Sequence, residues 1–165
     1  DLQAEIAYGN HPSSESHTGA IHAKIVQDVV DGRALAFKLS SVTDIRGSRV
    51  SPLGTVEGRK LRIYHGLTFA GDGYRSSVNG DTNFSAASPR ELVHFFGDVC
   101  RRILYLQHRF GVVTRVMLCR IDVKEAFRQI PVDPLQVAKF GYVFDECAVV
   151  DLFMQFWWRS SPGYW

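Results

Sequence analysis

The sequence predicts an α+β fold, and three observations support this prediction. The chain of 165 residues is 45% hydrophobic and 22% charged, which is the composition of a chain that buries a core. Apolar residues recur at helical spacing over residues 20–30 and 89–110. Short apolar runs bounded by turn residues, as is typical of strands, occupy much of the remainder. We therefore expect a long helix packed on a small antiparallel sheet.

The first 70 residues predict one helix and several strands. Residues 1–18 are polar and predict a loop. The first helix is expected over residues 20–30, because Gly32 follows it as a stop signal. Strands are expected over residues 34–39, 49–56 and 61–64. The last two of these strands should form a hairpin whose tip, residues 57–60, is basic.

The longest helix is expected over residues 89–110, after a loop over residues 71–88 that is rich in Gly, Asp, Ser and Asn. Ser88 is a suitable N-cap, and Pro89 suits the first helical position. A Glu follows at the position that closes a capping box. Apolar residues then recur at intervals of three and four, and Gly111 ends the pattern.

The last 50 residues predict a strand, a short helix and a hairpin. The strand is expected over residues 116–123 and contains Asp122 near its end. A short helix should follow over residues 124–130, because Pro131 stops it. Strands over residues 140–144 and 147–156 flank Asp145 and Glu146 and predict an antiparallel hairpin.

Composition excludes several classes of protein. The 19 Lys and Arg against 17 Asp and Glu give a net charge of +2, which excludes a strongly basic tail or an acidic disordered segment as the whole chain. Cys100, Cys119 and Cys147 fit neither a disulfide framework nor a zinc site, so we expect three buried, reduced thiols. No apolar run reaches the roughly 18 residues that span a bilayer, and no leader is apparent, so we expect an intracellular protein, cytoplasmic or nuclear, without a membrane partner.

A carboxylate at the end of an apolar strand makes Asp122 the first candidate for chemistry. Such a residue can hold a divalent metal, although alone it is more often a helix cap. Its neighbourhood favours the metal. Residues 122–132, DVKEAFRQIPV, resemble motif A of reverse transcriptases, in which three variable residues, an Ala and an aromatic residue follow an Asp.

Two other regions resemble the same family in the expected order. Residues 51–56, 60–68 and 77–79 (SPLGTV, KLRIYHGLT and SVN) are similar to the fingers motifs of retroelement polymerases. Residues 155–163, QFWWRSSPG, resemble motif B. The similarity is strongest to retrotransposon polymerases. It implies one partial reverse transcriptase domain over residues 1–165, with a fingers-like region at about 1–115 and a partial palm with motifs A and B at about 116–165.

The resemblance implies RNA-directed DNA polymerisation, with an RNA or DNA template–primer and deoxynucleotide triphosphates as partners. Asp122 would be the catalytic residue and a ligand of two Mg²⁺ ions, with the backbone carbonyl of Val123 as a second contact. These ions activate the primer 3′-hydroxyl and stabilise the leaving pyrophosphate.

The resemblance also implies two groups of binding residues. The nucleotide-binding group is Lys60, Arg62, Glu125, Ala126 and Phe127. Its two cations suit a triphosphate, and its aromatic ring would exclude a 2′-hydroxyl. The alternatives are a solvated turn for the cations and an ordinary core aromatic for the ring. The group that would line the base-pair pocket and template path is Phe156, Trp158, Ser161, Pro162 and Gly163. For these residues the alternative is aromatic core packing followed by a turn.

Positive charge concentrates in residues 33–62. This segment holds seven basic residues, Arg33, Lys38, Arg46, Arg49, Arg59, Lys60 and Arg62, against Asp44 and Glu57, so its net charge is 7 − 2 = +5. Such an excess suits a phosphate backbone, so weak and salt-sensitive binding of nucleic acid is expected through this segment.

The chain also departs from the family. Gly66 stands where relatives have Asp, and Trp157 and Ser160 replace frequent glycines. No Tyr-x-Asp-Asp motif C follows, and Asp151 is a poor substitute for its carboxylates. We therefore expect a truncated reverse transcriptase that is inactive as this chain. A non-catalytic nucleic-acid-binding or interaction module derived from such a polymerase is the second hypothesis, and an unrelated α+β domain is the third.

Overall fold

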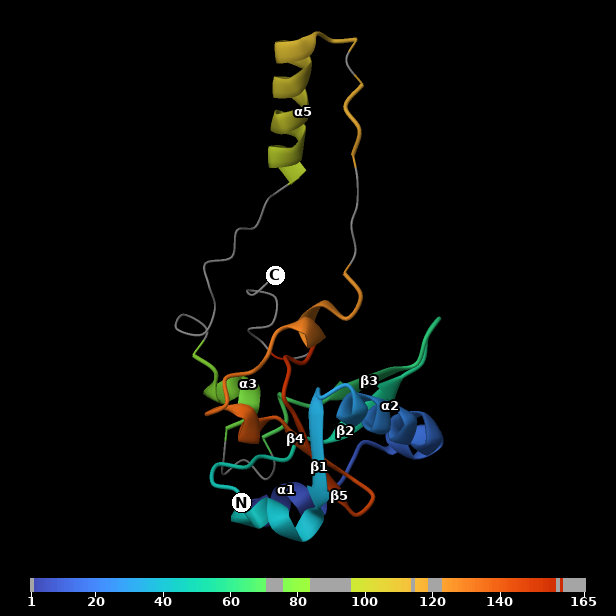
Figure 1. Ribbon diagram of the computed structural model, residues 1–165, viewed down its shortest axis with the longest axis vertical. Helices are drawn as coiled ribbons and strands as arrows, with labels where there is room; N and C mark the ends of the chain where they lie inside the picture. The colour runs from blue at the N-terminus through green and yellow to red at the C-terminus, as the bar shows by residue number, and fades with distance from the viewer. Residues whose placement is uncertain are drawn as a thin grey trace. The chain divides into compact units, whose positions relative to one another are not determined.

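The structure, a computed structural model, forms two compact units (Figure 1). The first unit comprises residues 1–89 and 125–165, and the second comprises residues 90–124. The first unit therefore combines residues from both sides of the expected boundary near residue 115. The structure describes residues 2–70, 76–83, 96–113, 115–118, 123–156 and 158.

The chain begins with two short helices, so the expected loop over residues 1–18 is wrong. They are α1 (Leu2–Tyr8) and the 3₁₀ helix η1 (Pro12–His17). Long-range contacts stabilise them: the Glu5 carboxylate pairs with Arg49, and the backbone N–H of His11 donates to the Leu53 carbonyl at 2.9 Å. Helix formation here depends on residues more than 40 positions away, which local sequence does not reveal.

The first expected helix is confirmed as α2 (Thr18–Val30). Its buried face carries Ile21, which has no exposed surface, and Asp28, which is 4% exposed. Gly32 follows it with a φ of +69°, a conformation that suits a residue without a side chain.

Three strands form an antiparallel sheet in the order β1-β5-β4. They are β1 (Ala34–Lys38), β4 (Gly141–Phe144) and β5 (Cys147–Asp151). The first strand and the hairpin around residues 145 and 146 are both confirmed, but β5 ends five residues earlier than expected. Leu35 pairs with Val150 in the register that joins β1 to β5. The first 40 residues are thereby connected to the last 20.

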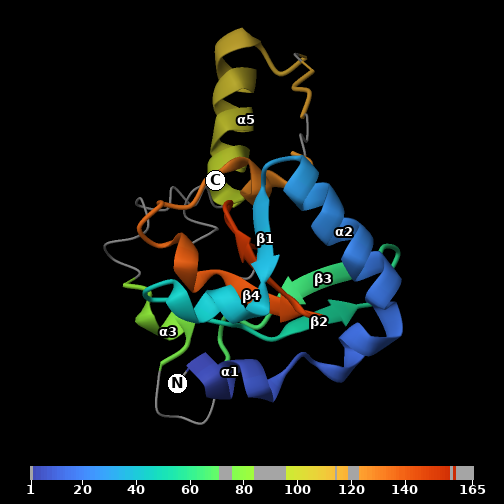
Figure 2. The ribbon, with the colours of Figure 1, turned by 60° about the horizontal axis from the view of Figure 1, so that its bottom comes forward.

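The expected basic hairpin is confirmed as β2 (Leu53–Val56) and β3 (Arg62–His65). Gly54 pairs with Tyr64, and a side chain at Gly54 would meet the Tyr64 ring. Residues 49–52 do not join the strand, although Val50 forms a parallel bridge to Gly141. Figure 2 shows this hairpin beside β4, and α2 alongside β1. The 3₁₀ helix η2 (Leu39–Asp44) follows β1.

Within the expected loop over residues 71–88, the structure describes residues 76–83. They form a short helix, α3 (Val78–Asp81), whose N-cap Ser77 accepts a hydrogen bond from the Gly80 N–H at 3.0 Å. Val78 and Asn79 are buried, so this part of the segment is not a surface loop. The other residues of that loop lie outside the described part.

The second unit contains the long helix α5 (Phe96–Phe110), which confirms the expected helix over the residues that the structure describes. Residues 89–95 lie outside them. Gly111 ends the helix with a φ of +94°. The strand expected over residues 116–123 does not form in its described part, where Met117 is 90% exposed. The packing of the long helix on the sheet stays a prediction.

Two further 3₁₀ helices precede the final hairpin of the first unit. η3 (Ala126–Gln129) confirms the short helix expected before Pro131, in a shorter form. η4 (Val137–Lys139) leads directly into β4. Pro131 forms an antiparallel bridge with Phe153, so the chain returns along the end of the sheet.

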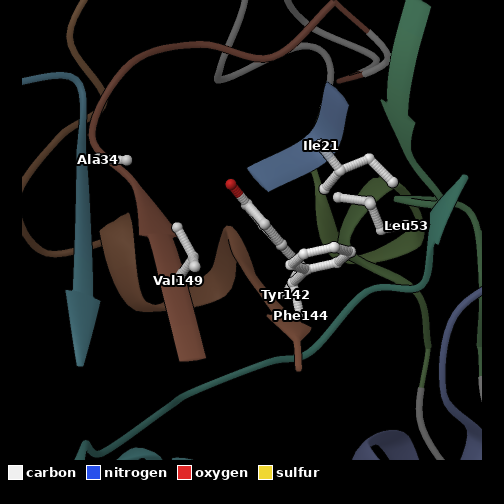
Figure 3. Packing of buried hydrophobic residues seen from close by; sticks show 6 residues of the cluster. All are labelled: Ile21, Ala34, Leu53, Tyr142, Phe144 and Val149. Carbon is white, nitrogen blue, oxygen red and sulfur yellow. The ribbon is translucent and has the colours of Figure 1, made fainter. Parts of the chain in front are cut away.

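Among the residues that the structure describes, two apolar clusters form the core of the first unit. The first cluster joins α2, the hairpin and the sheet through Ile21, Ala34, Leu53, Tyr142, Phe144 and Val149 (Figure 3). The second joins α3 to the last third of the chain through Leu67, Val78, Val132, Phe140 and Met154. Each fully buried Val, Leu, Ile, Phe or Met side chain in these clusters contributes roughly 1.5–3 kcal/mol to stability.

These elements confirm a mixed α+β architecture. Cys147 is exposed and Cys100 is half-buried, so the expectation of buried thiols is wrong for Cys147, which sits at the first position of β5 beside the hairpin turn. Cys119 lies outside the described residues. In the described part of the chain, no helix has the length and apolar character that crossing a membrane requires.

Candidate functional site

The tip of the β2–β3 hairpin presents cations to solvent. Lys60 lies in the connection between the strands, Arg62 opens β3 opposite Val56, and both residues are exposed. Successive side chains of a strand face opposite sides, so Arg62 and Tyr64 share one face while Ile63 and His65 share the other. Ile63 packs against the first core cluster, so Arg62 faces away from it.

The base of the hairpin is held by η1 and the residues before it. The Leu53 N–H donates to Asn10 Oδ1 at 2.9 Å, and the Thr55 N–H donates to Ser13 Oγ at 2.9 Å. The Thr55 hydroxyl donates to the Ser13 carbonyl at 2.6 Å. Side chains therefore satisfy this edge of β2, which fixes the base of the hairpin and leaves its basic tip in solvent.

Two of the seven basic residues counted for the 33–62 segment are not available to a ligand. Arg49 is 4% exposed and pairs with Glu5 at 2.9 Å and Asp81 at 3.0 Å. Arg33 pairs with Glu125 at 2.5 Å. The sequence-based count therefore overstates the local positive charge, because carboxylates from elsewhere in the chain neutralise both residues.

The other five basic residues of this segment remain exposed. None of them has an ion pair within the described part of the chain: Lys38, Arg46, Arg59, Lys60 and Arg62. Three of these lie within four residues at the hairpin tip, where they could contact consecutive phosphates.

The segment that follows the expected catalytic residue turns sharply. Glu125 has a φ of +51°, and Ala126 and Phe127 begin η3 directly after it. The Phe127 ring is half-buried against the second core cluster and meets the Phe156 ring edge-on, with 5.4 Å between the ring centroids. Phe156 itself is 67% exposed. The Phe127 ring therefore packs as the core-aromatic alternative predicts.

Trp158 also belongs to this packing. Its indole N–H donates to Thr82 Oγ1 at 3.0 Å, and its ring meets Phe140 edge-on at 5.4 Å. Both contacts agree with the core-packing alternative. Val123 is 44% exposed and lies in the second unit. The remaining expected site residues, Asp122, Ser161, Pro162 and Gly163, lie outside the described part.

The structure reveals a buried ionic cluster that the sequence did not predict. Arg128 lies 2.9 Å from Asp28 on α2 and 3.0 Å from Asp151 at the end of β5. The exposed fractions of the two carboxylate side chains are only 6% and 1%. Burial by itself lowers the pKa of the Arg128 guanidinium, but Asp151 and Asp28 outweigh it, so the pKa is raised and the side chain stays charged.

Three more polar groups surround Asp151. Gln155 Nε2 donates to its carboxylate at 2.5 Å, and His65 Nδ1 lies 3.4 Å from it. Burial lowers the pKa of His65 despite the attraction of Asp151, so the ring is neutral near pH 7. Burial also raises the pKa of the Tyr142 hydroxyl, which stays protonated. Asp151 is thus paired with Arg128, and is not a vacant carboxylate for a metal.

One sequence signal could have indicated this cluster. Asp28 follows Ile21 by seven residues, so both lie on the same face of α2. A carboxylate on a buried helix face requires a cationic partner, because burying an unpaired charge is costly. The identity of that partner could not be inferred, since Arg128 is 100 positions further along the chain.

In the part of the chain that the structure describes, no group of three or more His, Cys, Asp or Glu side chains is arranged to hold a metal ion. The Mg²⁺ ligands expected from the sequence, Asp122 and the Val123 carbonyl, stay a prediction. No family model, curated protein or solved structure matches this chain.

Proposed function

We propose that this chain is a reverse-transcriptase-like fingers and palm segment that binds the phosphates of an RNA or DNA template–primer through the β2–β3 hairpin. The observation that carries the proposal is the exposed, unpaired basic tip of that hairpin, at Arg59, Lys60 and Arg62. The antiparallel strands and the side chains of residues 10–13 support its base, so the cations project from a fixed platform. A template–primer as partner implies a cytoplasmic or nuclear location.

The order of the sequence motifs supports the same origin. The family's activity is RNA-directed DNA polymerisation, for which the resemblance implies that Lys60 and Arg62 bind the nucleotide triphosphate and that Glu125, Ala126 and Phe127 contact the rest of the nucleotide. When no nucleotide is bound, the same two cations would bind template–primer phosphates. Asp122 and the Val123 carbonyl would hold Mg²⁺, which stabilises negative charge on phosphate oxygens when bound.

Binding without catalysis is the form of this function that the described residues favour. Two-metal transfer needs carboxylates from more than one strand. Asp151, which lies at the end of β5, is paired with Arg128 and is therefore already neutralised. Asp122 is thus the one carboxylate that the resemblance assigns to catalysis. The proposal that we test is therefore a nucleic-acid-binding module derived from such a polymerase.

The dependence of binding on salt tests this proposal. The change is the triple substitution Arg59→Ala, Lys60→Ala and Arg62→Ala, and the readout is fluorescence anisotropy of a labelled RNA–DNA template–primer. Three phosphate contacts predict a slope of about −3 for log K against log salt between about 50 and about 200 mM. The substituted chain should bind weakly, with a slope close to that of residual non-specific contacts.

A matched control removes the same charge elsewhere. Arg101→Ala, Arg102→Ala and Arg109→Ala take three cations from the exposed surface of α5. This control should keep the slope of the unchanged chain. If the hairpin variant binds as the unchanged chain does at every salt concentration, the hairpin is not the interface and the proposal is wrong.

A further inference from the structure

The turn at Glu125 has an unusual backbone conformation. Its φ of +51° lies in the left-handed region, which residues other than glycine rarely adopt. The other residue of this kind in the described part, Asp145, sits in the tight β4–β5 turn, which explains it. Glu125 is in no hairpin of the described part, so its contacts with the rest of the fold, rather than a tight connection between strands, hold the conformation.

Two cations from neighbouring positions in the fold form ion pairs with this side chain. Arg33 Nη1 lies 2.5 Å from Glu125 Oε2, and Lys24 Nζ lies 3.7 Å from Glu125 Oε1. Lys24 belongs to α2, and Arg33 follows that helix immediately before β1. Both side chains therefore reach Glu125 from the α2–β1 corner, more than 90 positions earlier in the chain.

The same corner also holds the other end of the turn. Asp28 on α2 pairs with Arg128 at 2.9 Å and with Lys24 at 2.7 Å. The Arg128 N–H donates to the Glu125 carbonyl at 2.8 Å, which closes the turn. Residues 125–128 are thus attached at both ends to α2 and the residues that follow it.

The ion pairs at the two ends of the turn differ in burial. The side chains of Arg128 and Asp28 are only 15% and 6% exposed, so removing either partner would leave a poorly solvated charge and destabilise the unit. Glu125, by contrast, has a side chain that is 36% exposed, and those of Arg33 and Lys24 are 23% and 38% exposed. Pairs as exposed as these contribute little to global stability, so their principal effect is on local geometry.

We propose that Arg33 and Lys24 are positioning residues, which hold Glu125 in its left-handed conformation and so set the backbone of Ala126 and the ring of Phe127 against a deoxynucleotide. This inference rests on the proposed function, because Glu125, Ala126 and Phe127 are the residues through which the nucleotide would be bound. It adds that the α2–β1 corner determines how well that turn is formed.

Amide hydrogen exchange tests directly whether the ion pairs of Glu125 hold the turn. In the full chain, Arg33→Gln removes the charge that faces Glu125, and the Arg128 amide should then exchange about two- to fivefold faster, because one partly exposed charge pair is lost. Arg46→Gln is the matched control, because Arg46 is exposed and its substitution removes the same charge from the same basic segment. It should leave the exchange unchanged, and Arg33→Lys should restore most of the protection.

A second variant separates the conformation from general destabilisation. Glycine adopts a positive φ without strain, so Glu125→Gly does not need the cations. In that background, Arg33→Gln should cause no further change in the exchange of the Arg128 amide. An equal effect of Arg33→Gln in both backgrounds, or an effect no larger than that of Arg46→Gln, would overturn the proposal.

A binding measurement tests what the turn positions. Arg33→Gln should reduce the preference for Mg²⁺-dUTP over Mg²⁺-UTP, which differ only in the 2′-hydroxyl, about fivefold or more, because the Phe127 ring is no longer fixed beside the sugar. The affinity for template–primer should equal that of Arg46→Gln. An unchanged preference would show that the turn is held for another purpose and would overturn the positioning role. If the unchanged chain binds neither nucleotide nor template–primer, the proposed function fails. The exchange result then decides by itself whether the ion pairs of Glu125 hold the turn.

Discussion

At the scale of single residues, burial determines the protonation of the groups around Asp151. This carboxylate is 1% exposed and has Arg128, Gln155 and His65 around it. A cation already pairs with it, so a second positive charge at His65 would also lie close to Arg128. Burial and the Arg128 charge both lower the pKa of His65, and the neutral ring is the native form.

This protonation state makes stability depend on pH. The pKa of His65 in the folded chain lies below its ordinary value of 6.5, so between these two values the unfolded chain binds more protons. Stability from this residue is therefore fully present above pH 6.5 and is lost as the pH falls below it. We expect His65→Gln to abolish this loss, which is measured between about pH 7.5 and about pH 5.5.

Urea denaturation of the two chains at both pH values measures the effect. His22→Gln is the control, because His22 is exposed on α2 and its removal should leave the pH dependence unchanged. If His65→Gln and the unchanged chain lose equal stability on acidification, His65 is not neutral in the native state.

At the scale of elements, the approach of the hairpin to the sheet depends on one glycine. Gly141 opens β4 and forms a parallel bridge with Val50, just before β2. The Ser51 N–H donates to the Gly141 carbonyl at 2.9 Å, and a side chain at Gly141 would come within 2.6 Å of the Arg49 carbonyl oxygen. Because that oxygen is backbone, it cannot move aside without shifting the whole segment.

Gly141→Ala should therefore destabilise the chain by about 1–3 kcal/mol through overpacking. Thermal or urea denaturation measures this loss. Gly19→Ala is the matched control, because Gly19 lies in α2 with open space around it. Helix propensity predicts that the control raises stability by up to about 1 kcal/mol. Equal stabilities of the two variants would contradict the close contact between β4 and the residues before β2.

Elements set by local sequence were predictable, and those set by distant contacts were not. The helical spacing over residues 20–30 and the basic hairpin around residues 57–60 both match the structure. The helix α1 was missed because Glu5 finds its partner at Arg49. For the candidate site, the exposure of Lys60 followed from its place at a turn. The neutralisation of Arg33 did not, because its partner Glu125 is 92 positions away.

At the scale of the whole molecule, charge is divided between a buried network and an exposed tip. The network joins α2, β5 and η3 through Asp28, Asp151 and Arg128, and its two carboxylates are buried. The exposed tip of the β2–β3 hairpin holds Arg59, Lys60 and Arg62 without ion pairs in the described part of the chain. A net charge of +2 thus conceals a local concentration of positive charge, which is the proposed site for phosphates.

The most direct test of this site is residue-resolved mapping by NMR. The amide resonances of the full chain would be recorded during titration with an RNA–DNA template–primer at low salt. We predict that the largest chemical-shift changes occur at residues 57–62, and that the amide resonances of β5 and α1 do not shift. Shifts confined to α5, or an absence of shifts at the hairpin tip when the nucleic acid is bound, would contradict the proposed interface.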